Sequence, residues 1–200
     1  MEKDLKIFEL NRQLFHLFLG LIIVALLLYE IIDKKIMLFL ALIGLVLSYS
    51  CKKAKIPAIY QLLKIFERKE DLKAFPGKGM IFYFIGCCVS LFLFSNEIAM
   101  ASIMVLALGD SISHIFGLHY GKTKTFLSKT KFLEGTIAGF IAGFAGALMF
   151  LPWLEAFFAS LSAMIIEAIE IKIGTKQIND NLIVPFAAGA AVWILRWINV

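Results

Sequence analysis

Residues 98–117 read IAMASIMVLALGDSISHIFG, an apolar stretch that carries two ionisable side chains near its end. An α-helix needs about 20 apolar residues to cross a bilayer, which is the length of this stretch. Asp110 and His114 are one helical turn apart, so they would share one face of the helix. Ionisable groups within a membrane helix are costly and usually face a bundle interior or a water-filled cavity. The stretch therefore predicts a membrane helix in a bundle that contains a polar site.

The composition of the whole chain agrees with a membrane protein. Of its 200 residues, 60% are hydrophobic, against about 45–50% in an ordinary soluble domain. With 4 prolines and 3 cysteines, a collagen-like repeat and a disulfide scaffold are excluded. The apolar stretches do not alternate with period two, which argues against a membrane β-barrel. We predict an all-α, polytopic helical bundle that forms one integral membrane domain over residues 1–200.

Six further apolar segments accompany residues 98–117 along the chain. The seven predicted spans are residues 13–32, 36–51, 79–95, 98–117, 133–151, 154–171 and 181–198.

The basic residues predict how these spans are oriented. With a cytoplasmic N-terminus, 17 of the 20 Lys and Arg residues fall on the cytoplasmic side, and only Lys34, Lys35 and Arg196 fall outside. Cytoplasmic loops of membrane proteins carry such an excess of Lys and Arg. The distribution therefore supports seven spans. It also explains the net charge of +5 without nucleic acid as a partner.

The longest loop, residues 52–78, contains an amphipathic pattern. Ile59, Leu62, Leu63 and Phe66 repeat at helical spacing, with charged residues between them. The pattern predicts a cytoplasmic helix lying on the inner leaflet, where attachment to anionic lipid is a simpler role than catalysis.

A stripe of small residues runs along the fifth span. Gly135, Gly139, Gly143 and Ala147 recur every four residues, which allows a second helix to approach closely. Internal packing and formation of a homo-oligomer both fit this pattern.

Most ionisable groups in or beside the spans lie at one depth, near the cytoplasmic interface. Because solubility alone would not select one depth, we infer a polar cavity open to the cytoplasm. The groups are Arg12, His16, Asp110, His114, Glu134, Glu167 and Asp180.

The composition of this cavity predicts its chemistry. Four carboxylates, on Asp110, Glu134, Glu167 and Asp180, are hard oxygen ligands suited to Mg²⁺. The loop before the fifth span supplies cations, hydroxyls and glycines that suit phosphate oxygens. Together these groups indicate a nucleoside triphosphate site whose second substrate arrives from the bilayer. The loop residues are Gly117, Gly121, Lys122, Lys124, Ser128, Lys129, Thr130 and Lys131.

Each of these features also has a simpler explanation. The lysines could serve topology alone, and His16 and His114 could be supporting polar residues. Asp180 with Asn181 could cap the last span, since both residue types accept hydrogen bonds from free N–H groups.

Three separated motifs resemble the signature of the CTP-dependent lipid kinases, the family of dolichol kinase, phytol kinase and the yeast-type CTP-dependent diacylglycerol kinase. The chain departs from the family at Gln13, where a Lys is usual, and at Phe132, where a Thr or Ser is usual. The motifs are Arg12-Gln13 with His16 and Gly20; GDSISHIFG at 109–117, YGKTK at 120–124 and KFLEGT at 131–136; and Glu167 with Asp180-Asn181-Leu182 and Pro185.

The resemblance implies transfer of the γ-phosphoryl group of CTP to the hydroxyl of a lipid alcohol. A polyprenol or dolichol-like alcohol is the first expectation, followed by diacylglycerol or phytol. Asp110 and Glu134 would bind Mg²⁺ or position the hydroxyl, and Glu167 and Asp180 would complete the metal or hydrogen-bond shell. Arg12, Lys122 and Lys131 would neutralise phosphate charge. The resemblance implies three catalytic residues, Asp110, Arg12 and Glu134.

Two other functions remain open. The CTP-dependent phosphatidate cytidylyltransferases, which make CDP-lipids, share a similar central core, but their long C-terminal signature is absent here. A small ion-coupled transporter also places carboxylates inside a helical bundle, although usually near the midplane with access from both sides.

Overall fold

A computed structural model describes residues 2–54, 56–125, 128, 130–169, 171–173 and 176–198, and each of the seven predicted spans overlaps a helix. The largest difference is at the first span, predicted as residues 13–32, where the helix covers Glu2–Leu28. The first two are α1 (Glu2–Leu28) and α2 (Lys34–Ala54), followed after the long loop by α5 (Lys78–Leu93). The fourth is continuous through α6 (Asn96–Met104), the π-helical segment η1 (Val105–Asp110) and α7 (Ser111–Tyr120). The last three are α8 (Leu133–Ala147), α9 (Trp153–Ile169) and α10 (Asp180–Ile198).

The remaining elements are short. Two helices, α3 (Pro57–Phe66) and α4 (Lys69–Ala74), occupy the loop between α2 and α5. A hairpin that the sequence did not predict pairs β1 (Lys172–Ile173) with β2 (Lys176–Gln177) in antiparallel register before α10. The predicted helical architecture is therefore confirmed, and the described residues add this strand pair and the short helix α4 to it.

Four helical stretches are long and apolar enough to cross a membrane, by length and composition. They are Leu5–Leu28, Lys34–Lys53, Asn96–Tyr120 and Asp180–Ile198. Lys78–Leu93 and Leu133–Ala147 are apolar but shorter. Integral membrane character follows from the four, whereas crossing by all seven helices stays a prediction.

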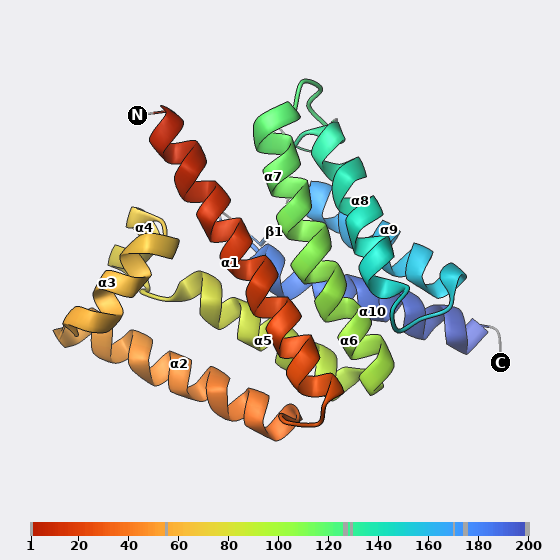
Figure 1. Cartoon of the computed structure of the whole chain (residues 1–200), viewed down its shortest axis with the longest axis horizontal. Helices are drawn as coiled ribbons and strands as arrows, with labels where there is room; N and C mark the ends of the chain where they lie inside the picture. Colours follow the sequence, from red (N-terminus) through yellow and green to blue (C-terminus); the bar gives the residue numbers. More distant parts are fainter. Residues whose placement is uncertain are drawn as a thin grey trace.

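The helices pack around the stretch from α6 to α7, which is largely buried (Figure 1). α2 packs against α5 and otherwise leaves its apolar side chains uncovered, with Phe39 62% and Val46 65% exposed. Such a surface would be unstable in water but is ordinary against lipid. The centre of the bundle is filled by Tyr83, Leu106 and Met164.

The small-residue stripe on α8 packs inside the molecule. A Cβ atom at Gly135 would lie 2.5 Å from the carbonyl oxygen of Ser113, and one at Gly139 would lie 2.6 Å from that of Gly109. Only glycine permits this backbone approach. The stripe therefore brings α8 against η1 and α7, the segments that carry Asp110 and His114.

Candidate active site

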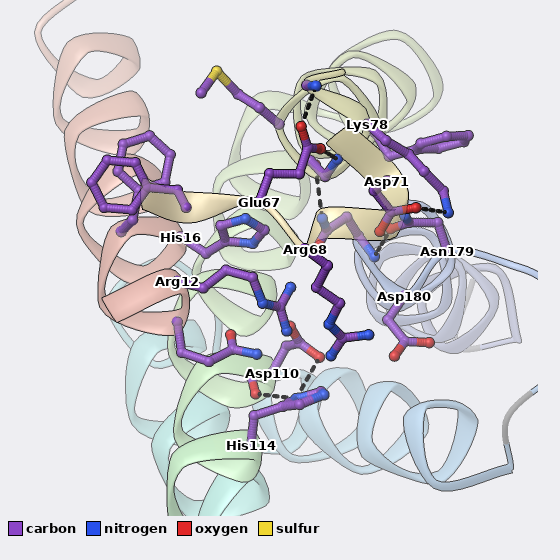
Figure 2. Close-up of a pocket in the computed structure, with 18 of the residues that line it drawn as sticks. Arg12, His16, Glu67, Arg68, Asp71, Lys78, Asp110, His114, Asn179 and Asp180 are labelled. Carbon is purple, nitrogen blue, oxygen red and sulfur yellow. Dashed lines mark hydrogen bonds and ion pairs between the residues drawn. The ribbon is translucent and has the colours of Figure 1, made fainter. Parts of the chain in front are cut away.

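A cavity of about 830 Å³ lies between α1, α3, α4, α5, α7 and the start of α10. Figure 2 shows Asp110 and His114 at one end and Glu67, Asp71 and Lys78 at the other, with Arg12 and Arg68 between them. Residues from all three sequence motifs meet here, although they are far apart in the chain. The polar lining consists of Arg12, Gln13, His16, Glu67, Arg68, Asp71, Lys78, Asp110, His114, Thr130, Lys131, Asn179, Asp180 and Asn181.

Four potential metal ligands cluster at the Asp110 end of this cavity. Asp110, His114, Glu167 and Asp180 each offer one ligand atom, and these atoms all lie within 4.8 Å of one another. Asp110 and His114 are one turn apart on the continuous stretch of η1 and α7, whereas Glu167 comes from α9 and Asp180 from α10, so local spacing alone could not create the cluster. Three of the four ligands are carboxylates, which makes the set oxygen-rich and suited to a hard divalent cation such as Mg²⁺.

Lys131 lies within this cluster. Its ammonium group donates to the carboxylate of Glu167, lies 3.2 Å from Asp180 Oδ2, and lies 3.4 Å from Nε2 of His114. Burial opposes the charge of Lys131, but the carboxylates of Glu167 and Asp180 outweigh it and raise its pKa above the ordinary range. The site therefore holds a permanent positive charge between two acids.

Asp110 is positioned by the backbone as well as by packing. It ends the π-helical segment η1 within an otherwise α-helical span. Such π-turns are rare and often occur at functional sites. His114 Nδ1 lies 3.0 Å from the carbonyl oxygen of Asp110 and 3.4 Å from its Oδ1. Among the described residues, the buried Oε2 of Glu167 makes no hydrogen bond, and the buried Oδ1 of Asp110 makes none beyond its 3.4 Å ion-pair contact with His114. Buried oxygens with spare hydrogen-bonding capacity are suited to bind a cation or substrate.

The N-terminal motif forms the adjoining wall. Gln13, which replaces the usual Lys, is buried, and its Oε1 has no hydrogen-bond partner among the described residues. The ring of His16 packs edge-on against Tyr83, 5.3 Å between centroids. Asn181 donates its side-chain amide to the carbonyl oxygen of Gly79 at 2.9 Å, which joins the start of α10 to α5.

The structure does not bring all predicted site residues into the cavity. Glu134 lies outside its lining and accepts the backbone N–H of Thr123 at 3.0 Å, so His114 rather than Glu134 joins the carboxylate cluster. Gly117 and Gly121 pack against Phe132 instead of facing the cavity.

The rest of the lysine-rich loop is organised by its own contacts. Lys124 lies over the ring of Phe132, 3.7 Å from its centroid, and donates to the carbonyl oxygen of Thr130 at 3.2 Å. Ser128 Oγ accepts the backbone N–H groups of Thr130 and Lys131, at 3.0 and 3.1 Å. The exposed Lys122 is outside the cavity lining, and Lys129 lies outside the described residues. Of the loop residues that the structure describes, Thr130 and Lys131 reach the cavity.

The segment between α3 and α5 supplies cavity residues that the sequence analysis did not assign to a site. Glu67 is 8% exposed and accepts the backbone N–H groups of Gly77 and Gly79. Burial raises the pKa of Glu67 above its usual value, and these N–H groups only partly offset that rise. The sequence showed an acid directly after an apolar helical stripe, but no spacing indicated that this segment packs over the cavity.

Known proteins with similar sequences include members of the family that the three motifs resemble. An uncharacterized protein of Methanocaldococcus jannaschii is 35% identical over 187 residues, which cover 89% of each protein. CTP-dependent diacylglycerol kinase 1 of Schizosaccharomyces pombe is 24% identical over 135 residues, and the chloroplastic phytol kinase 1 of Arabidopsis thaliana is 28% identical over 134. These matches cover 58% of this chain and 60% and 43% of the two kinases. No family model matches the chain, and no solved structure matches it significantly.

The fold and the cavity define a helical membrane protein with a buried, charged site. The chain belongs to the same family as the Methanocaldococcus jannaschii protein and is related to the CTP-dependent lipid kinases, as its three motifs predicted. It spans about half the length of the curated kinases that it matches.

Proposed function

We propose that the protein is a CTP-dependent lipid kinase that phosphorylates the hydroxyl of a membrane lipid alcohol. The observation that carries this proposal is the convergence of Asp110, Asp180, Arg12 and Lys131 in the lining of one cavity. Glu167 is buried beside them, where it pairs with Lys131 and joins the acidic cluster. Carboxylates for a divalent ion beside cations for phosphate are the groups that phosphoryl transfer from a nucleoside triphosphate requires. A polyprenol or dolichol-like alcohol is the first acceptor to test, followed by diacylglycerol and phytol.

The carboxylate cluster fits a magnesium ion. Asp110, Glu167 and Asp180 would hold Mg²⁺, which would neutralise charge on the phosphates when bound. The support for this assignment is the short mutual distance of the ligand atoms, together with Oδ1 of Asp110 and Oε2 of Glu167, which are buried and make no hydrogen bond among the described residues.

In this reaction the residues of the chain would have three roles: binding phosphate, activating the lipid hydroxyl and orienting Asp110. Lys131 and Arg12 would bind phosphate oxygens and stabilise the charge on the transferred group. Asp110 would position the lipid hydroxyl and accept its proton. The hydroxyl oxygen would then bond to the γ-phosphorus while the bond from that phosphorus to the β-bridging oxygen breaks and CDP leaves. His114 would orient Asp110 through the contacts described above.

The lysine-rich loop would contribute further nucleotide contacts. Thr130 and Lys131 bring its end to the cavity, and Ser128 supports both through hydrogen bonds to their backbone. Gly117, Gly121, Lys122 and Lys124 lie along the same loop or its start, where the rest of CTP would extend. Glu134 would act by holding the loop at Thr123 rather than by binding metal.

We further propose that all seven apolar helical stretches cross the membrane, including the shorter α5 and α8, with the N-terminus and the cavity on the cytoplasmic side. The uneven distribution of Lys and Arg supports this orientation. In it, α3 and α4 would lie at the inner leaflet, as the amphipathic pattern of residues 57–66 predicts.

The direct test is incubation of the purified protein in detergent or liposomes with CTP, Mg²⁺ and each lipid alcohol separately. CTP labelled in the γ position should transfer its label to the lipid extract, whereas CTP labelled in the α position should not. The acceptor that gives labelled lipid identifies the substrate class.

Two results would overturn the proposal. With phosphatidate as the acceptor, transfer of the α-labelled CMP unit of CTP to its phosphate, with the β- and γ-phosphates of CTP leaving as pyrophosphate, would establish a cytidylyltransferase. Absence of lipid label from every acceptor, together with ion flux in proteoliposomes without nucleotide, would establish a transporter.

A further inference from the structure

Arg68 and Arg12 share one carboxylate at the cavity. Glu9 Oε2 lies 2.9 Å from Nη2 and 3.0 Å from Nε of Arg12, while its Oε1 accepts from Nε of Arg68 at 2.8 Å. Arg68 is 59 residues from Glu9 in sequence and belongs to the connection between α3 and α4. The bridge therefore places two guanidinium groups side by side.

The segment that carries Arg68 is held against the cavity by several contacts. Phe66 stacks on Phe15 of α1, with ring centroids 4.5 Å apart. Glu67 accepts backbone N–H groups at the start of α5, and Lys78 lies 2.7 Å from Asp71. Arg68 is therefore a defined part of the cavity wall and not merely a basic residue on the surface.

The charges around Glu9 do not balance. At Glu9, one carboxylate faces two guanidinium groups, although the acids Glu70 and Asp71 also act on Arg68. Arg68 touches Glu9 through Nε, and its side chain remains 56% exposed. Figure 2 shows both arginine side chains extending toward the Asp110 end of the cavity. The planar fork of arginine matches the oxygens of a phosphate group better than any other side chain.

We propose that Arg68 is a second phosphate-binding residue, paired with Arg12 by the positioning carboxylate of Glu9. Its ligand is a phosphoryl group, either in the triphosphate of the nucleotide or on the phosphorylated lipid. This inference rests on the proposed kinase function for its kinetic test, but the binding of a free polyphosphate tests it independently.

The kinetic experiment compares the wild type with Arg68→Ala, Arg68→Lys and Lys73→Ala. Lys73 is an exposed cation on α4 that does not line the cavity, so its removal makes the same change in charge. Arg68→Ala should raise the KM for CTP, or the inhibition constant of the lipid phosphate, by about tenfold. Arg68→Lys should recover part of this loss, and Lys73→Ala should stay within about twofold of the wild type. The constant that rises identifies whether nucleotide or lipid phosphate is bound.

A second measurement does not depend on transfer. Binding of inorganic triphosphate to the wild type should be about tenfold tighter than to Arg68→Ala, with melting temperatures that agree between the two. Equal affinity of the two proteins for triphosphate would overturn the role of Arg68. So would an active Arg68→Ala enzyme whose KM for CTP and inhibition constant for the lipid phosphate are both unchanged. A different outcome would overturn the kinase proposal alone. In that case the wild type would transfer no phosphate to lipid, but it would still bind triphosphate about tenfold more tightly than Arg68→Ala.

Discussion

The ammonium group of Lys131 and the carboxylate of Glu167 form an ion pair inside the bundle, although 36 residues separate them in sequence. The side chain of Glu167 is completely buried, and that of Lys131 is 12% exposed. Charged groups removed from water are stable only when they are paired. This pair joins the loop before α8 to α9 and keeps a cation close to Asp110, His114 and Asp180.

Removing one partner of that pair should destabilise the protein. Lys131→Met leaves Glu167 buried without its cation, a change that typically costs about 3–5 kcal/mol. The apparent melting temperature in detergent should therefore fall. The double variant Lys131→Met/Glu167→Gln should recover much of the stability without recovering transfer. A double variant as unstable as the single one would contradict this account.

Asp110→Asn should remove activity without removing the fold. The substitution keeps the size of the side chain but loses the negative charge and the proton-accepting oxygen. We expect kcat for lipid phosphorylation to fall by at least about 10²–10³. Size-exclusion profile and melting temperature provide the control, and full activity of a folded Asp110→Asn protein would refute the role of Asp110.

Transfer should require a divalent cation held by the acidic cluster. EDTA should abolish transfer of label, and added Mg²⁺ should restore it. Asp180→Asn removes one negative ligand and should raise the Mg²⁺ concentration for half-maximal activity by about tenfold. Unchanged activity in EDTA would show that the carboxylates serve another purpose.

Packing of α8 should be sensitive to substitution at Gly139 and insensitive to substitution on the exposed side of the helix. Gly139→Ala places a methyl group 2.6 Å from the carbonyl oxygen of Gly109, so α8 must move away from η1. Overpacking of this kind typically costs about 1–3 kcal/mol, and displacement of Asp110 should lower kcat. Ile141→Ala is the matched control, because Ile141 lies on the same helix and is 60% exposed. Equal effects of the two substitutions would exclude close packing as the cause.

Glu67 should make stability depend on pH in weakly acidic solution. Burial raises its pKa above the usual 4.5, so the folded protein keeps a proton that the unfolded chain loses first. The contribution of protonated Glu67 to the free energy of unfolding is fully present below pH 4.5. It is lost as the pH rises through the higher pKa that Glu67 has in the folded protein. The free energy of unfolding should therefore fall with pH across this window in the wild type and less in Glu67→Gln. Thermal unfolding of both proteins at a series of pH values checks this prediction. The same dependence of stability on pH in the wild type and in Glu67→Gln would contradict it.

The helices were predictable because their signals are local. Each apolar run is continuous, and the shift to charged or turn residues marks most of the ends within a few positions, as for the helix that begins at Asp180. The exception is α1, which begins at Glu2 although the apolar span was predicted to begin at residue 13. The pairing of Asp110 with His114 was also predictable, since residues four apart share a helix face. The hairpin before α10 was missed because two strands of two residues each leave almost no pattern.

The site was predictable only in part. Common depth correctly grouped Asp110, His114, Glu167 and Asp180, because depth follows from position along each helix. It also grouped Glu134, which the structure places beside Thr123, because depth says nothing about which way a side chain faces around the bundle axis.

By itself the sequence determined the helical class, the order of the apolar segments and the kinds of charge that meet near one interface, since these depend on composition and local spacing. Only the tertiary structure decided that Arg68 reaches Glu9 and that Lys131 lies between Glu167 and Asp180. Such contacts depend on the rotation and crossing of helices, which result from packing of the whole bundle, as where Gly139 meets Gly109.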